Sequence, residues 1–129
     1  MVELTHALSV TPASYDDPEG ARLAVLRLLA NEPRLSQRDL SRALGVSLGK
    51  THYLVHALLD KGLLKAHNFR RSDNKIAYAY VLTPRGINEK LRMTRSFLHR
   101  KEAEFDALRQ TIAGLRSELV TEREREALK

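Results

Sequence analysis

The spacing of apolar residues predicts three short helices in the first half of the chain. Over residues 17–31, leucines and alanines recur at helical intervals after an Asp-Pro pair that suits an N-cap and first helical position. A second helix over 36–44 opens with Ser-x-x-Asp, and a third over 47–61 opens with another serine. Gly45 between them suits the left-handed residue that ends a helix. Two short helices joined by such a glycine turn predict a helix-turn-helix.

A pair of strands is predicted directly after these helices. Residues 63–69 and 76–82 contain the apolar and aromatic residues that suit strands, and the run RRSDNK separates them. A β-hairpin in this position is a wing, and its basic tip is suited to contact phosphates or to enter the minor groove of DNA. The alternative is an ordinary solvated hairpin. The tip residues predicted to contact DNA are Arg70, Arg71, Asn74 and Lys75.

One long helix is predicted for the rest of the chain. From Thr83, which suits its N-cap, to about Leu119, nothing strongly breaks a helix. A helix of about 36 residues is roughly 54 Å long, which is too long to bury itself on a domain of this size. Apolar residues recur at alternating intervals of four and three, with Thr94 and Lys101 at two of these positions, as is typical of a coiled-coil seam. The apolar seam positions are Ile87, Leu91, Leu98, Phe105, Leu108, Ile112, Leu115 and Leu119.

The two polar seam positions place the main coiled-coil contact in the second half of this helix. In the first half, Ile87, Leu91 and Phe97 are expected to pack on the helix's own domain instead. The alternative is one amphipathic helix folded back on the domain. The predicted dimerisation residues are Leu98, Phe105, Leu108, Ile112, Leu115 and Leu119.

These elements predict a fold class that is mainly α with a small β-hairpin. Its expected organisation is a winged helix-turn-helix DNA-binding domain followed by a long coiled-coil helix. The predicted segments are a loose N-terminal arm over 1–16, the winged helix-turn-helix over 17–82, the dimerisation helix over 83–120 and a frayed tail over 121–129.

The distribution of charge favours a nucleic-acid partner. The net charge of the chain is +6, and residues 21–86 carry twelve basic and four acidic side chains. A compact basic module is the electrostatic footprint of a nucleic-acid binder, although a solvated basic surface is the alternative. The absence of cysteine excludes disulfides and cysteine-ligated metal sites and favours the cytoplasm. The N-terminal residues resemble no secretory signal and no stretch is apolar enough to span a membrane, so no membrane partner is expected.

The third helix gathers its polar residues at its front, where a recognition helix contacts base edges. Glycine there lets the backbone approach DNA closely, a lysine reaches a phosphate or a guanine, and short hydroxyl groups form hydrogen bonds. The alternative for Thr51 is a core position. The residues of this helix predicted to contact DNA are Ser47, Gly49, Lys50, Thr51, His52, Tyr53 and His56.

The run LSQRDLSRALGVSLGKTHYLVHALLDKGLL, a charged turn containing Asp73, and then LTPRG at 82–86 resemble the winged-helix core of MarR-type bacterial transcriptional regulators over residues 20–90. Within that family the pattern is similar to a small subgroup associated with exopolysaccharide gene clusters. The resemblance implies that the front of the third helix reads DNA and that Arg38 and the wing hold its backbone. Lys75 replaces the arginine usual two residues after the wing acid, and the N-terminus offers only a short arm in place of a dimerisation helix.

The sequence contains no pattern typical of catalysis, so an enzyme and a cofactor are not expected. His52 and His56 are one helical turn apart, which permits a metal site, but no third ligand lies nearby in sequence, so DNA contacts are preferred to a metal. The predicted function is therefore a homodimeric transcriptional regulator that binds an inverted repeat in double-stranded DNA. The alternative is a winged-helix protein-interaction module that docks through its coiled-coil arm. Neither reading identifies a small-molecule effector.

Overall fold

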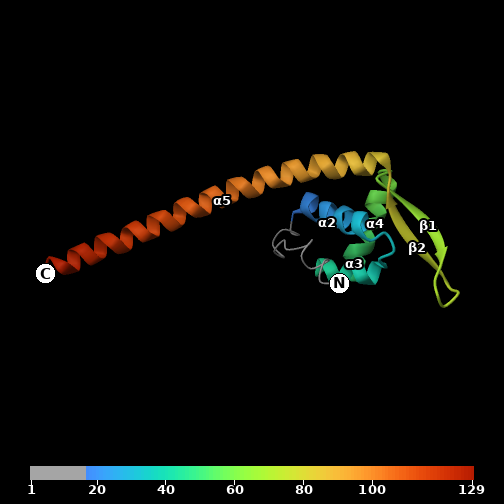
Figure 1. The fold of residues 1–129 in the computed structure, drawn as a ribbon, viewed down its shortest axis with the longest axis horizontal. Coiled ribbons are helices and arrows are strands. Elements are labelled where there is room, and N and C mark those ends of the chain that lie inside the picture. Colours follow the sequence, from blue (N-terminus) through green and yellow to red (C-terminus); the bar gives the residue numbers. More distant parts are fainter. Residues whose placement is uncertain (1–16) are drawn as a thin grey trace. The chain divides into compact units, whose positions relative to one another are not determined.

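Figure 1 shows the fold of the computed structural model, which describes residues 17–129. The elements are α2 (Pro18–Asn31), α3 (Gln37–Leu44), α4 (Leu48–Asp60), β1 (Leu64–Arg70), β2 (Ile76–Leu82) and α5 (Pro84–Ala127). The predicted fold class, mainly α with a small β-hairpin, is therefore confirmed. The loose arm predicted for residues 1–16 lies outside the described residues. The chain divides into two compact units, the first ending at Thr94 and the second comprising Arg95–Lys129.

The predicted helix boundaries in the first unit are confirmed by their caps. Asp17 accepts a hydrogen bond from the backbone N–H of Glu19 at the start of α2. At the start of α3, Ser36 and Asp39 form a capping box in which each side chain accepts from the backbone N–H of the other residue. Gly45 ends α3 with a φ of +69°, a left-handed conformation that favours glycine. These local bonds place α4 directly after a tight turn.

Helix α2 lies at the centre of the first unit, against α3, α4 and β2 (Figure 1). Its buried residues extend around most of its circumference, as expected of a core helix. Leu26 on α2, Leu40 on α3 and Leu58 on α4 are each fully buried, and burying a leucine contributes about 1.5–3 kcal/mol. This core holds α3 and α4 together and leaves the opposite face of α4 exposed.

The hairpin is anchored at its base and free at its tip. Strands β1 and β2 pair antiparallel, with Leu64 opposite Leu82 at the base. The backbone N–H of Tyr80 donates to the carbonyl of Pro33 at 3.0 Å, which ties β2 to the turn between α2 and α3. At the tip, Asn74 has a φ of +64°, which asparagine tolerates better than most residues. The hairpin therefore extends from the helix-turn-helix as a wing.

Helix α5 begins in close contact with the turn that precedes β1. The hydroxyl of Thr83 accepts from the N–H of Gly86 at 3.0 Å and donates to the carbonyl of Gly62 at 2.6 Å. Gly86 is buried, and a Cβ at this position would overlap the carbonyl oxygen of Leu63. Only glycine permits this approach without a shift of the backbone.

The face of α5 that packs within the first unit is not the predicted one. Met93 is buried, whereas Ile87 and Leu91 are 58% and 51% exposed. The prediction that Ile87 and Leu91 pack on the winged helix is therefore wrong. The close approach at Gly86 sets the rotation of the helix, and Met93, two turns later, shares its inward face.

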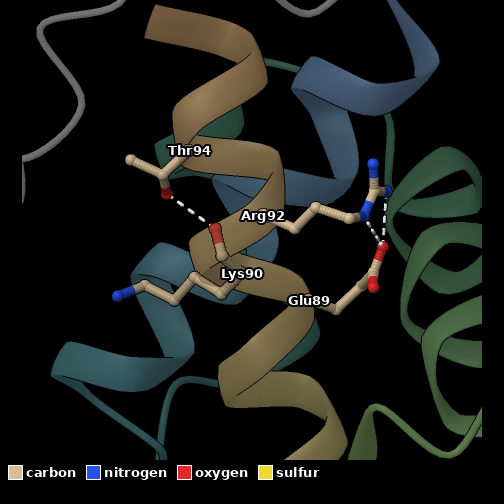
Figure 2. Close-up of polar contacts among 4 residues, drawn as sticks. All are labelled: Glu89, Lys90, Arg92 and Thr94. Atoms are coloured by element: carbon tan, nitrogen blue, oxygen red, sulfur yellow. Dashed lines mark hydrogen bonds and ion pairs between the residues drawn. The ribbon is translucent and has the colours of Figure 1, made fainter.

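Polar contacts join residues about one turn apart near the start of α5 (Figure 2). Arg92 donates a hydrogen bond to the carboxylate of Glu89, and the hydroxyl of Thr94 donates to the carbonyl of Lys90 at 2.7 Å. The hydrogen bond from Arg92 lowers the pKa of Glu89 below its ordinary value. The ion pair between Glu89 and Arg92, three positions apart, supports the helix locally.

In the second unit α5 continues to Ala127, so the prediction that it ends near Leu119 and that 121–129 is frayed is wrong. The residues after Leu119 are mostly good helix formers, and Arg125 donates to Glu122 one turn earlier at 3.4 Å. Phe97 is half-buried, with the ammonium of Lys101 5.1 Å from its ring centre.

No helix among the described residues is long and apolar enough to cross a membrane.

Candidate nucleic-acid interface

The front of α4 combines a helix N-terminus with exposed polar side chains. Ser47 caps the helix by accepting a hydrogen bond from the N–H of Lys50 at 3.1 Å. The four larger predicted DNA-contacting residues are exposed, while Leu54, Val55 and Leu58 face the core. The exposed residues are Lys50, His52, Tyr53 and His56. The helix therefore presents a polar surface on the side away from α2.

Gly49 lies in the first turn of this surface, and packing does not require it to be glycine. A Cβ built at Gly49 meets no atom within 4 Å, and its backbone conformation is helical. Glycine in a helix costs roughly 0.5–1 kcal/mol relative to alanine. No neighbour among the described residues therefore requires glycine at this position to offset its cost to the helix. The missing side chain leaves room for another molecule to approach the backbone.

Thr51 does not belong to this exposed surface. Its side chain is fully buried, and its hydroxyl donates to the carbonyl of Ser47 at 3.0 Å. The prediction that Thr51 contacts DNA is therefore wrong. Helical spacing places Thr51 on the same side as Leu54, Val55 and Leu58, which α2 covers.

Arg38 and the front of α4 border one shallow hollow. The hollow has a volume of about 570 Å³ and lies between the first turns of α3 and α4. Gln37, Arg38, Gly49 and His52 are among the residues that line it. The fold thus brings Arg38 beside two of the residues predicted to read bases, although eleven positions separate it from Gly49 in the sequence.

A hydrogen-bonded chain of side chains connects α4 to the wing. Gln37 donates through Nε2 to the hydroxyl of Tyr80 at 3.2 Å, and its Oε1 lies 3.2 Å from Nδ1 of His52. The ring of His56 follows, with its centroid 4.1 Å from that of His52. The sequence analysis did not select Gln37 or Tyr80, since neither position has a local pattern that marks it.

A second, larger groove separates the wing from the turn between α2 and α3. It has a volume of about 800 Å³, and three arginines and three aromatic residues line it. The guanidinium of Arg34 lies 4.8 Å from the ring centre of Phe69 on β1. The arginines and aromatic residues that line the groove are Arg34, Arg70, Arg71, Phe69, Tyr78 and Tyr80. Arg34 was also missed by the sequence analysis, and its separation from Phe69 in the sequence explains why.

The predicted wing residues are ordered by contacts within the tip. Arg70 donates through Nη1 to Oδ1 of Asn74 at 2.9 Å, and Arg71 lies 3.6 Å from a carboxylate oxygen of Asp73. The backbone N–H of Lys75 donates to the same Asp73 side chain, leaving the ammonium group exposed. The tip therefore presents three cations with one acid among them.

Metal binding finds no support in the described part of the chain. No group of three histidine, cysteine, aspartate or glutamate side chains among residues 17–129 is placed to hold a metal ion. His52 and His56 are adjacent, but no third ligand within these residues joins them. The two grooves are lined by cationic, amide, imidazole and aromatic side chains, among others.

Comparison with known proteins supports this description. Residues 20–65 match the sequence model of a family described as winged helix-turn-helix DNA-binding. No curated protein sequence matches the chain. A transcriptional regulator homologue from Pyrococcus horikoshii OT3 has a similar structure with a TM-score of 0.52 and 17% identity, over 80% of this chain and 97% of that chain.

Two further solved structures are similar. A MarR/EmrR family transcriptional regulator from Acinetobacter sp. ADP1 has a TM-score of 0.52 and 21% identity, over 77% of this chain and 74% of that chain. MepR from S. aureus, solved with DNA, has a TM-score of 0.53 and 21% identity, over 66% of this chain and 58% of that chain. At these identities the likeness concerns the fold, and the predicted resemblance to MarR-type regulators is confirmed at that level.

Proposed function

Because the chain combines a winged helix-turn-helix with the fold of MarR-type regulators, we propose that it is a transcriptional regulator that binds double-stranded DNA sequence-specifically as a homodimer. The single observation that carries the proposal is the front of α4, where an unexplained glycine and exposed polar side chains lie beside a cationic wing. Such a helix presents its first turns to base edges in the major groove. MepR, a protein of similar fold, was solved in complex with DNA, which supports DNA binding by this fold.

The exposed residues divide into two roles. Lys50, His52, Tyr53 and His56 present the donors, acceptors and rings that contact base edges, and Gly49 lets the backbone approach. Other cationic side chains contact the phosphates of DNA, and these contacts do not depend on the base sequence. These phosphate-binding residues are Arg34, Arg38, Arg70, Arg71 and Lys75.

The second copy of the chain binds along the seam of α5. In the second unit the seam side chains from Leu98 to Leu119 are between 39% and 64% exposed. Six apolar side chains at alternating intervals of four and three match a second helix with the same spacing, which an identical chain provides. We therefore assign the main dimer contact to this segment, with Lys101 as the one polar seam position.

The resemblance to the exopolysaccharide-associated subgroup extends the proposal to the regulated genes. On this basis exopolysaccharide genes are among the expected targets, and the site of action is the cytoplasm, where the DNA is. The front of α4 and the α5 seam serve binding, so no enzymatic activity is assigned. Mapping the chromosomal sites that the protein occupies tests the gene assignment.

The decisive experiment is selection of bound sequences from a random duplex pool by the purified protein at near-physiological salt. We expect enrichment of an inverted repeat whose half-site centres are about one helical turn, or a small multiple of it, apart. Affinity should fall steeply with salt because the contacts include phosphates. Binding with no enriched motif contradicts the proposal.

Substitutions of residues on α4 that are proposed to contact bases test whether α4 is the recognition helix, with the same selection experiment. We expect Lys50→Ala and His52→Ala each to lower discrimination between the selected site and single-base mismatches by about tenfold. Arg71→Ala is the matched control, since loss of a phosphate contact weakens all sequences alike and reduces the salt dependence. Specificity that survives both α4 substitutions contradicts the assignment of α4 as the recognition helix.

A protein-interaction module is the second candidate function. It is favoured by two exposed apolar side chains on the wing, Ile76 at 67% and Tyr78 at 59% exposure. Protein interfaces are enriched in such aromatic anchors. Under this alternative, Tyr78→Ala and Ile76→Ser abolish capture of a protein partner while the selection experiment yields no motif.

A further inference from the structure

Three side chains from three separate elements meet behind the exposed surface of α4. Gln37 opens α3, His52 lies in the second turn of α4, and Tyr80 lies on β2. The amide of Gln37 joins the other two, with Nε2 3.2 Å from the Tyr80 hydroxyl and Oε1 3.2 Å from His52 Nδ1. The amide is therefore bound at both of its ends.

Tyr80 is the fixed end of this chain of contacts. Its side chain is only 8% exposed, and its backbone N–H is bonded to the carbonyl of Pro33. With Nε2 of Gln37 donating to this hydroxyl, the other end of the planar amide directs its carbonyl oxygen toward His52. In this orientation the amide connects the wing strand to α4.

A carbonyl oxygen accepts hydrogen bonds and cannot donate them, so Nδ1 of His52 must carry a proton to bond with Gln37. A neutral imidazole has one N–H, which leaves Nε2 of His52 as an acceptor. His52 is exposed on the predicted recognition surface. The ring of His56 packs on it at a centroid distance of 4.1 Å and a tilt of 45°, which restricts its rotation.

We propose that Gln37 is a positioning residue that fixes the tautomer of His52, so that Nε2 accepts a hydrogen bond from the exocyclic amino group of adenine or cytosine in the major groove. This inference rests on the proposed DNA-binding function. In the major groove only adenine N6 and cytosine N4 offer such a donor, whereas guanine and thymine offer acceptors. Tyr80 on the wing strand thereby contributes to base selection without touching DNA.

The first test reads the tautomer of His52 directly, in the full-length protein without DNA, by ¹⁵N–¹H correlation spectra of the imidazoles at about pH 8, where imidazoles are neutral. We expect the proton on Nδ1 in the wild type and in Gln37→Glu, which keeps an accepting oxygen. Gln37→Ala should shift the ring toward the Nε2–H form, and Gln110→Ala on α5 is the matched control that leaves it unchanged. A wild-type proton on Nε2 overturns the inference, even if DNA binding is normal.

The second test uses sequence selection to find the base-pair position at which preference is lost in His52→Ala. We expect the wild type to prefer one base pair there, and about a fivefold loss of this preference in Gln37→Ala, the size of one hydrogen bond. The double variant Gln37→Ala/His52→Ala should lose no more of the preference than His52→Ala alone, because the two substitutions remove the same contact to the base. Tyr80→Phe, which removes only the hydroxyl, should lose part of the same preference.

The two proposals fail in different ways. A Gln37→Ala loss that is equal at all positions overturns the tautomer inference and leaves the regulator intact. Absence of any enriched motif overturns the regulator and the inference together. A wild-type Nδ1–H that Gln37→Ala leaves unchanged overturns the positioning role of Gln37 alone.

Discussion

Residues at the front of α4 differ in what their side chains contact. Some bond to the helix's own backbone, and others are exposed without such a bond. Ser47 and Thr51 bond to the helix's own backbone, one as its cap and the other as a buried side chain. Only Thr51 is buried among these four positions, whereas Ser47, Lys50 and His52 are exposed. Substitutions at neighbouring positions should therefore differ in how they affect stability and DNA binding.

Gly49→Ala should separate these two properties. We expect the free energy of unfolding to rise by up to about 1 kcal/mol, because the added Cβ meets no atom within 4 Å and alanine favours the helix. Affinity for the selected duplex should fall, because the Cβ blocks the approach of DNA to the backbone. Denaturant melts and binding titrations check the two effects. Unchanged affinity would show that Gly49 lies outside the DNA interface.

Thr51→Val should leave DNA binding unaltered, in contrast to a substitution of a residue that contacts bases. Valine keeps the shape of threonine, and the Ser47 carbonyl that loses the hydroxyl still accepts the backbone N–H of residue 51 at 3.0 Å. We expect unfolding free energy to change by less than about 1.5 kcal/mol and DNA affinity to be unaltered. A specific loss of base discrimination, with the stability unchanged, would restore Thr51 to the DNA interface.

At the scale of elements, the start of α5 shows how one close contact orients a helix. The backbone of Gly86 touches the carbonyl of Leu63, and this contact turns Met93 inward and Ile87 outward. The hairpin is oriented similarly, by the bond from Tyr80 to Pro33 at its base. Both elements are thus positioned by backbone contacts with the turns on either side of the helix-turn-helix.

Gly86→Ala should destabilise the first unit, and Gly114→Ala provides a matched control in the same helix. The Cβ at position 86 would overlap the Leu63 carbonyl, whereas the Cβ at 114 meets nothing within 4 Å. We expect Gly86→Ala to cost about 1–3 kcal/mol of unfolding free energy, as overpacking does. Gly114→Ala should raise helix stability by up to about 1 kcal/mol. Thermal melts that rank the two variants in the reverse order contradict the close approach.

At the scale of the whole molecule, charge and apolar surface occupy different parts of the chain. Residues 21–86 carry most of the excess of basic over acidic side chains, whereas Arg95–Lys129 exposes the apolar seam. Under the proposed function, dimerisation through the seam would join two basic modules, so that each module binds one half-site and the pair binds more tightly than one module. Oligomeric state and DNA affinity should therefore change together.

Leu108→Asp combined with Leu115→Asp should yield monomers. Charges at two seam positions oppose burial against a second helix, and the loss of the second module should weaken binding to an inverted repeat by at least tenfold. Light scattering and DNA titration measure the two effects. Gln110→Asp with Ser117→Asp, two positions that lie off the seam, is the matched control. A mass unchanged from the wild type in the seam variant would refute the coiled-coil dimer.

Local sequence patterns were sufficient to predict the elements of the first unit. The Ser36–Asp39 capping box, the left-handed Gly45 and the cap at Thr83 depend on residues within a few positions of one another, and all three were predicted. Hydrophobic spacing also predicted the hairpin and the long helix, since each period depends on one element alone. The end of α5 was placed too early because the apolar seam stops at Leu119, whereas the residues after it are mostly good helix formers.

The tertiary structure decided which faces and which distant residues meet. The burial of Thr51, the inward turn of Met93, the stacking of Arg34 on Phe69 and the chain from Tyr80 through Gln37 to His52 all join separate elements. Such contacts depend on how helices and strands rotate and approach in space, and a single sequence contains no periodic signal for them. The sequence by itself therefore determined the elements and their caps, while three-dimensional packing determined the surface that they present.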